Sequence, residues 1–345
     1  MKIFAKIFLI ISIAVLAAWQ IPWLIGYFDT KTDRTPFTLY SCVTGDFAIL
    51  KHDGDDFTYT DRKGNIYTER QFDSILPLFY ARQLFSEGRF PDTLDSKPIV
   101  FKEALEKSFF FTSRPSDINR SVPGIYFLLE SESGRVDLEM PSDAFRINGR
   151  GIEFIDMETN STDTAKSRIF TQAMSECGFV FPAKCVSGNP TPKKEYDEGY
   201  ILADSEGSLF HLKMTKGKPY IRKIRLPDAV IAEHAFITEF GDRSMIALFT
   251  DSENRFYAVR MPGYKTMEIG MAGKGFDPCR ESILVVGNML DWTIRINSDD
   301  SVRYCAVSAE SLTFLAGMEY PVRKSRLHGI RFTSQQDRFV KPRLY

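Results

Sequence analysis

The hydrophobic pattern of the chain begins with a run that contains no charged side chain, at residues 7–28. At about 1.5 Å rise per residue, a helix of this length spans the roughly 30 Å hydrocarbon layer of a bilayer. A helix satisfies its own backbone hydrogen bonds there, as a spanning segment must. The run therefore predicts a transmembrane anchor over residues 1–28, then a polar spacer at residues 29–38 and a folded body at residues 39–345.

The flanks of this run indicate its orientation. Basic residues precede it, and basic flanks stay in the cytoplasm, so we expect the body on the periplasmic side of the cytoplasmic membrane. Aromatic residues gather near its far end, where such side chains favour the lipid–water boundary. The predicted membrane-anchor residues are Lys6, Ile7, Trp19, Trp23, Tyr27 and Phe28.

A cleaved signal peptide is the alternative interpretation of the same run. It requires a shorter apolar core and small residues at a cleavage site. The best small pair, Ala17 and Ala18, is followed by more apolar sequence. The pattern therefore favours an uncleaved anchor.

Behind the spacer the pattern changes from strand to helix and back. Residues 48–68 indicate two short strands with tight turns. Thr68 and Gln71 fit a capping box, and apolar residues recur at helical spacing up to Gly88, which predicts one amphipathic helix of about five turns, bent by Pro77. A short helix is expected at residues 101–107 and a buried strand at residues 109–111.

A recurring phrase fills the later two thirds of the chain: an apolar run, an acidic or Gly/Asn turn, and an alternating run. Each phrase predicts a β-hairpin. The phrases begin at residues 125, 201, 246 and 283. Repeats of about 40 to 50 residues with several strands each are typical of propeller blades. We expect a mainly β fold: a β-propeller-like body with one amphipathic helix inserted early. A β-sandwich or an irregular pair of sheets is the alternative.

Composition narrows the class of protein. With 43% hydrophobic and 26% charged residues the chain is globular, and its net charge of −1 gives no basic surplus for a nucleic-acid partner. The five cysteines show no metal-ligand spacing. Outside the cytoplasm Cys177 with Cys185, or Cys279 with Cys305, could form a bridge, and the alternative is that all five are small apolar side chains.

The motifs that mark common active sites are missing from the sequence. There is no Gly-x-Ser-x-Gly elbow, no Cys-x-x-Cys, no His-Glu-x-x-His and no phosphate-binding loop. The acidic turns at residues 53–56 and 204–207 lack the spacing of an EF-hand, and His211, between Phe210 and Leu212, is expected to be packed. We predict no catalytic, cofactor-binding or metal-binding residue.

Basic residues gather near the carboxyl end of the chain. Such a cluster could contact anionic lipid head groups or an acidic partner, although ordinary solvated strands also carry Arg and Lys. The candidate contact residues are Arg323, Lys324, Arg326, Arg338, Lys341 and Arg343.

Four stretches resemble an uncharacterised bacterial family that is known only as a domain of unknown function. They are residues 76–92, 114–119, 196–200 and 339–343. The resemblance implies a membrane-anchored envelope protein of gut anaerobes, often encoded with ABC-transporter components. It therefore implies membrane lipid and an ABC-transporter permease as partners, and it assigns no catalytic residue.

Two functions follow as hypotheses. The first is a non-enzymatic accessory or sensor protein of the bacterial envelope, held at the membrane. The alternative is an envelope glycan hydrolase that uses paired carboxylates in a propeller channel. That alternative requires two acidic side chains about 5 to 10 Å apart in a pocket, at least one with a raised pKa.

Overall fold

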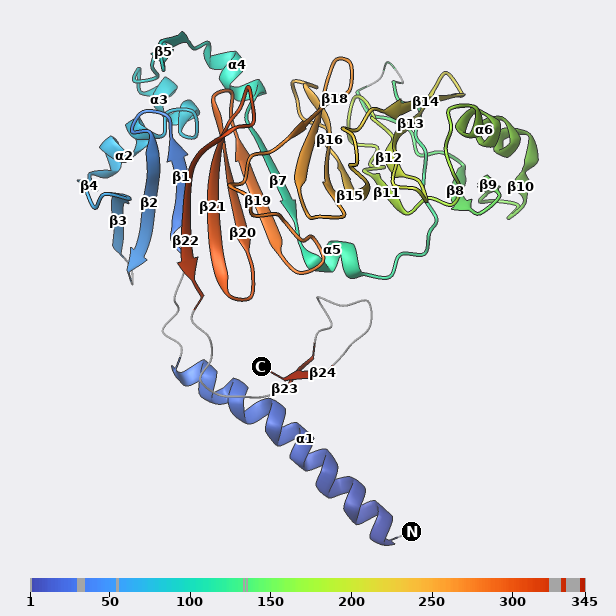
Figure 1. Cartoon of the computed structure of the whole chain (residues 1–345), viewed down its shortest axis with the longest axis horizontal. Coiled ribbons are helices and arrows are strands. Elements are labelled where there is room, and N and C mark those ends of the chain that lie inside the picture. The colour runs from blue at the N-terminus through green and yellow to red at the C-terminus, as the bar shows by residue number, and fades with distance from the viewer. Residues whose placement is uncertain are drawn as a thin grey trace.

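The chain begins with a helix that stands apart from the rest of the protein (Figure 1). The computed structural model describes residues 2–29, 35–53, 56–132, 134, 136–322, 330–332 and 342–344. Helix α1 (Lys2–Asp29) contains the apolar stretch Ile3–Ile25, whose mean hydropathy is 2.1, and no residue of this stretch is buried. A helix with an apolar surface all around, and no core to cover it, matches lipid better than water.

The body consists of small antiparallel sheets, most of them built from strands that are consecutive in the sequence. The first sheet is β1 (Phe37–Ser41), β2 (Asp46–Asp53), β3 (Asp56–Asp61) and β4 (Ile66–Tyr67). The second sheet is β8 (Asp143–Asn148), β9 (Gly151–Asp156) and β10 (Thr162–Asp163). The third sheet is β11 (Cys185–Gly188), β12 (Tyr200–Ala203), β13 (Leu209–Thr215) and β14 (Lys218–Ile224).

The remaining two large sheets complete the body. The fourth sheet is β15 (Ala232–Ile237), β16 (Met245–Asp251), β17 (Phe256–Arg260) and β18 (Lys265–Glu268). The fifth sheet is β19 (Ser282–Gly287), β20 (Asp291–Asn297), β21 (Ser301–Ser308) and β22 (Phe314–Pro321), with β7 (Phe109–Ser113) paired to β19. The expectation of a mainly β, propeller-like body with an apolar amino-terminal helix is confirmed.

Short helices and hairpins occupy the connections. They are α2 (Glu69–Ile75), α3 (Ala81–Ser86), β5 (Thr93–Leu94), β6 (Lys97–Pro98), α4 (Phe101–Glu106), α5 (Pro115–Asn119), α6 (Thr164–Glu176), β23 (Ile330–Phe332) and β24 (Pro342–Leu344). The capping box of Thr68 and Gln71 is present. The single bent helix expected around it is wrong, because α2 ends at Ile75 and α3 begins at Ala81, with Pro77 in the turn between them. Proline removes a helical donor and crowds the preceding turn, which is enough to end a helix.

The sheets pack face to face, and their order in space differs from their order in the sequence. Consecutive residues of one strand join different cores: Leu248 packs toward the fifth sheet and Phe249 toward the third. Shared cores give the order first, fifth, fourth, third, second, which Figure 1 shows across the molecule. Full burial of a side chain such as Leu248 contributes about 1.5–3 kcal/mol. The central strand β16 is buried along its whole length, because its two faces supply two different cores.

Three of the four expected hairpins are present, as β12–β13, β16–β17 and β19–β20. The first, at residues 125–138, is wrong. The described residues of that segment form isolated bridges and no strand pair, with Tyr126 bridged to Phe145 in the second sheet and Glu130 to Met214 in the third. The segment crosses between two sheets, so Leu128, Leu129 and Leu138 are buried without forming a hairpin, while Ile125 and Val136 are exposed. The strand expected at residues 109–111 exists as β7, but it lies at a sheet edge and Phe110 is 62% exposed.

Candidate functional site

The predicted anchor residues all lie on α1. Ile7, Trp19 and Trp23 are exposed on it, and Lys6 lies in its first two turns. Tyr27 and Phe28 lie in its last turn. By its length and composition, α1 is able to span a membrane or to act as a signal anchor.

Most of the predicted basic contact residues lie outside the described part of the chain. These are Arg323, Lys324, Arg326, Arg338 and Lys341. Arg343 lies in β24, which pairs with β23, and β23 contacts α1. The role of these residues in lipid or partner contact stays a prediction.

The acidic turns of the repeated phrase have a structural role. In three hairpins an aspartate at the end of a strand accepts the backbone N–H of the residue four positions later: Asp61 from Asn65 at 2.9 Å, Asp204 from Ser208 at 2.8 Å and Asp251 from Arg255 at 2.8 Å. The residue three positions after each aspartate has a positive φ: Gly64, Gly207 and Asn254. Gly and Asn tolerate this conformation best. Each aspartate thus closes its own hairpin, and the turn chemistry accounts for its presence.

Residues 194–198 join the third and fourth sheets through buried and half-buried charges. Lys194 Nζ lies 2.8 Å from Asp197 Oδ1 and 2.7 Å from Glu239 Oε1. The backbone N–H of Glu198 donates to Glu239 Oε1 at 3.0 Å. Burial raises the pKa of Asp197, although the Lys194 ammonium opposes this. Part of the stretch that carries the family resemblance is therefore a junction between two sheets.

His211 is packed, as expected, and it extends this junction. Its Nε2 lies 2.6 Å from the carbonyl oxygen of Glu198, and its Nδ1 lies 2.7 Å from the hydroxyl of Tyr264. A carbonyl only accepts, so Nε2 carries the proton and Nδ1 accepts from Tyr264. Burial lowers the pKa of His211, which agrees with a neutral ring. The Tyr264 hydroxyl is also 3.1 Å from that of Tyr220, so the three side chains form one chain of hydrogen bonds.

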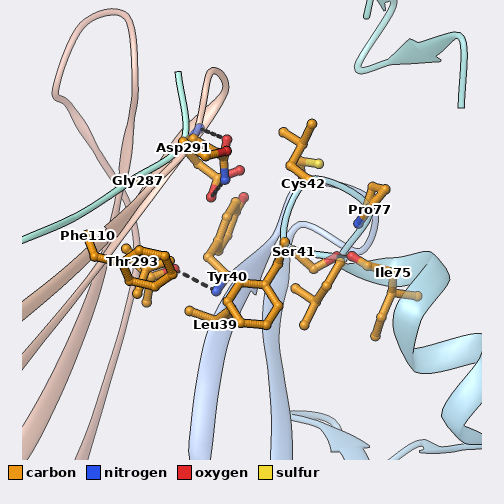
Figure 2. Close-up of a pocket in the computed structure, with 16 residues that line it drawn as sticks. Leu39, Tyr40, Ser41, Cys42, Ile75, Pro77, Phe110, Gly287, Asp291 and Thr293 are labelled. Carbon is orange, nitrogen blue, oxygen red and sulfur yellow. Dashed lines mark hydrogen bonds between the residues drawn. The ribbon is translucent and has the colours of Figure 1, made fainter. Parts of the chain in front are cut away.

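A cavity of ≈ 230 Å³ lies between the first and fifth sheets (Figure 2). The end of β1, the turn after α2, β7 and the β19–β20 hairpin form its wall. The apolar lining consists of Leu39, Ile75, Leu76, Leu78, Phe79, Phe110 and Val286, among others. A cavity with an apolar wall and a few convergent polar groups is the usual form of a small-molecule site.

Most polar side chains of this lining already have hydrogen-bond partners within the protein. The Ser41 hydroxyl donates to the Ile75 carbonyl at 2.6 Å, and Ser108 donates to the Ala104 carbonyl at 2.6 Å. The hydroxyl oxygen of Thr293 accepts the N–H of Tyr40 at 2.8 Å, which links the two sheets. Within the described part of the chain, no hydrogen bond reaches the Tyr40 hydroxyl, which Figure 2 shows pointing toward Asp291.

Asp291 is a buried ionisable group in the wall of this cavity. It is 3% exposed, and its Oδ1 accepts from the Asn288 side-chain amide at 3.1 Å. Burial raises the pKa of Asp291 to about 7, and the Asn288 amide offsets only part of this effect. The Cys42 thiol, on the same wall, has its pKa raised to about 12 by burial and by the charge of Asp291, so it is a poor nucleophile at neutral pH.

Sequence reasoning did not identify Asp291, Tyr40 or Cys42. The hairpin around residues 283–296 was expected, but an aspartate in a turn is normally explained by the turn itself. The available signal was the neighbouring Asn288, whose Oδ1 accepts the N–H groups of Leu290 and Asp291 at 2.8 and 3.0 Å. Asn288 therefore accepts the backbone N–H groups of this turn, and Asp291 takes part only through one oxygen, which accepts the Asn288 amide.

All five cysteines are unpaired in the structure, so neither expected bridge is present. Their thiols contact protein groups instead: Cys185 donates to the carbonyl of Ala235 and Cys305 to that of Gly270. They act as small packed side chains, which was the alternative interpretation.

The family model described as "Domain of unknown function (DUF4857)" matches residues 37–307, well over half of the chain. The chain belongs to this family. The match reaches from the first residue of β1 into β21, so it includes the cavity wall and the Lys194 junction. The expected membership of a family of unknown function is confirmed. No curated protein matches the sequence.

Solved structures similar to this family member include a β-propeller domain and a component of a secretion system. The Cps50 (Swd1) β-propeller domain of Myceliophteria thermophila is 12% identical, with a TM-score of 0.31, and covers 63% of this chain and 62% of its own. PorZ, a surface component of the type-IX secretion system of Porphyromonas gingivalis, is 9% identical, with a TM-score of 0.26, and covers 85% of this chain. This chain spans about three fifths of the Swd1 chain and 33% of the PorZ chain.

Proposed function

We propose that this protein is a non-enzymatic, membrane-anchored accessory or sensor protein of the bacterial envelope. The observation that carries the proposal is α1, whose apolar stretch Ile3–Ile25 leaves the body and has no buried residue. Leaving that surface in water is unfavourable, whereas a bilayer accommodates it. Lys2 and Lys6 at its start support a body on the periplasmic side.

The sensor part of the proposal draws support from the cavity. In Figure 1 α1 leaves the lower side of the body, while α3 and α4 lie along its upper side. The cavity is lined by the last residues of β1 and the turn before α3, so it opens near the end of the body away from α1. A ligand dissolved in the envelope would reach it without crossing lipid.

The lining of this cavity supports binding more than catalysis. Among the described residues that line it, Asp291 is the one carboxyl group, whereas glycan hydrolysis uses two. The Ser41 hydroxyl is occupied by the Ile75 carbonyl, and no histidine lies in the described wall to activate it. The hydrolase alternative draws no support from this site.

Membrane fractionation of cells that express the full chain tests the anchor. We expect the protein in the membrane pellet after alkaline carbonate extraction, with its amino terminus intact by mass spectrometry. The double variant Ile11→Arg, Leu16→Arg should reduce membrane retention, because each charge at the centre of a span costs about 2.5–3.5 kcal/mol. Leu16→Ala, which keeps the run apolar, is the matched control. A soluble protein that lacks the first two dozen residues would refute the proposal.

The same cells are used to test on which side of the membrane the body lies and whether a permease binds the protein. Protease added to spheroplasts should degrade the body, and a body protected until the membrane is opened would refute the periplasmic placement. The partnership with an ABC-transporter permease, which the family resemblance implied, predicts that a permease co-purifies in mild detergent. Recovery of the protein alone at stoichiometric purity would contradict the partnership.

A further inference from the structure

The cavity between the first and fifth sheets contains a buried carboxylate, that of Asp291, which the fold uses on one oxygen only. In the hairpins of Asp61, Asp204 and Asp251 the acid accepts backbone N–H groups and closes the turn. In the β19–β20 hairpin Asn288 has that role, and Asp291 accepts the Asn288 amide on Oδ1 only, so its Oδ2 is available for another partner. Buried carboxylates are costly and are normally paired, so a buried acid with one oxygen left over suggests a ligand.

No cation within the described residues complements Asp291. Its surroundings are the amide of Asn288 and the apolar wall, and none of the described residues that line the cavity is basic. The charges that act on its neighbours Tyr40 and Cys42 are also acidic: Asp291 itself, with Asp46 and Asp95. Within the same residues, the side-chain hydrogen bond to Asp291 ends on Oδ1, and none reaches Oδ2. A positive charge that complements the Asp291 carboxylate would therefore have to come from a bound ligand.

The rest of the lining fits the carbon part of such a ligand. The rings of Tyr40, Phe79 and Phe110 line the cavity together with aliphatic side chains. Aromatic faces attract an ammonium group as well as apolar carbon. The cavity of ≈ 230 Å³ is larger than the roughly 150 Å³ cavity that accommodates a benzene molecule. A single substituted ring with a short side chain is therefore the appropriate size.

We propose that this cavity binds a small amphipathic amine, with its ammonium group on the Asp291 carboxylate and the Tyr40 hydroxyl, and its apolar body against Phe79, Phe110 and Val286. This deepens the proposed sensor function and rests on it. The ammonium group would donate to Oδ2 of Asp291, and the hydroxyl oxygen of Tyr40 would accept a second of its hydrogens.

Three probes with one carbon skeleton test the charge requirement. The full chain in detergent is titrated with 3-phenylpropan-1-amine, 3-phenylpropan-1-ol and 3-phenylpropanoic acid at pH 8, followed by saturation-transfer NMR and calorimetry. We expect the amine to bind about ten- to hundredfold more tightly than the alcohol, since hydrogen bonds to charged groups contribute more than neutral ones. The acid should bind more weakly still, because two carboxylates repel. Preference for the alcohol or the acid would overturn the proposal.

Variants of the lining residues distinguish binding of the amine in the cavity from its uptake into detergent micelles. Asp291→Asn should lower amine affinity about ten- to hundredfold and leave the affinity for the alcohol nearly unchanged. Tyr40→Phe should lower amine affinity by about three- to tenfold through loss of one hydrogen bond. Asp228→Asn, an exposed acid in the loop before β15 and away from the cavity, is the matched control and should bind as the wild type does. Each variant is first shown to unfold cooperatively.

The binding data and the membrane fractionation test the ligand assignment and the membrane anchor independently. Equal amine affinity in wild type and Asp291→Asn would overturn the ligand assignment, while carbonate extraction would still report on α1. A protein that binds the amine through Asp291 but is recovered in soluble form would keep the ligand assignment and refute the membrane attachment.

Discussion

Replacing Asp291 by asparagine should change how the stability of this protein depends on pH. The side chain is almost completely buried, and the pKa of its carboxyl group rises from 3.8 to about 7 on folding, mainly through burial. At about 1.4 kcal/mol per pKa unit, ionisation of this one group lowers the free energy of unfolding by about 4 kcal/mol. This is a large share of the roughly 5–15 kcal/mol that stabilises a typical domain.

The sign follows from proton binding. Between about pH 4 and pH 7 the folded protein keeps a proton on Asp291 that the unfolded chain has lost. Stability therefore falls as pH rises through this window, and the full cost is present above pH 7. An asparagine side chain at this position would resemble the protonated acid in shape and charge, so the variant should equal the wild type near pH 4 and exceed it by about 3–4 kcal/mol at pH 8.

Urea unfolding of the full chain in detergent measures this difference. Trp292, 5% exposed and packed against Phe109, reports on the body, whereas Trp19 and Trp23 lie on α1. Burial also raises the pKa of Asp197 and lowers that of His211, so the wild-type curve alone is ambiguous. The difference between wild type and Asp291→Asn isolates one group. Parallel curves from pH 4 to pH 8 would refute the reasoning.

Three further substitutions test the supporting structure by the same unfolding assay. Asp251→Ala removes the acceptor of two backbone N–H groups and of the Tyr257 hydroxyl, so we expect the free energy of unfolding to fall by about 3–4 kcal/mol. The control Ser252→Ala, at an exposed position, should lower it by less than about 0.5 kcal/mol. Equal losses would contradict the hairpin role of Asp251. Gly199 has a φ of +70, and Gly199→Ala places a Cβ against the Leu212 carbonyl oxygen, so it should lower the free energy of unfolding by about 3 kcal/mol or more. Gly217 has the same φ but faces open space, so Gly217→Ala should cost about 1 kcal/mol. Similar values for the two variants would show that the contact is unimportant. Lys194→Met leaves Asp197 and Glu239 without their shared cation, which should cost about 3–5 kcal/mol at pH 8. The cost should be smaller at pH 4, because burial raises the pKa of Asp197 and its carboxyl group takes up a proton there; a pH-independent loss would contradict this.

The parts of the fold that the sequence predicts are local. The anchor is one uninterrupted apolar run. In the β12–β13 and β16–β17 hairpins an alternating strand follows a loop in which an aspartate and a residue of positive φ are three positions apart. Both signals lie within a few residues, so each can be read from the sequence. The hairpin expected at residues 125–138 fails because its apolar residues Leu128 and Leu129 are buried between two other sheets, and burial of that kind gives the same pattern as a strand.

The cavity could not be predicted in this way, because its walls come from distant parts of the chain. Leu39 and Asp291 meet only because the fifth sheet, last in the sequence, packs between the first and the fourth. No periodicity in the sequence encodes that order. What the sequence does contain is a redundancy: Asn288 and Asp291 both stand in one turn that needs a single acceptor side chain. When a turn beside an apolar strand contains two such polar residues, one of them can be available for binding. Asp291 shows the physical reason: the described part of the fold buries its carboxylate and supplies no cation to pair with it.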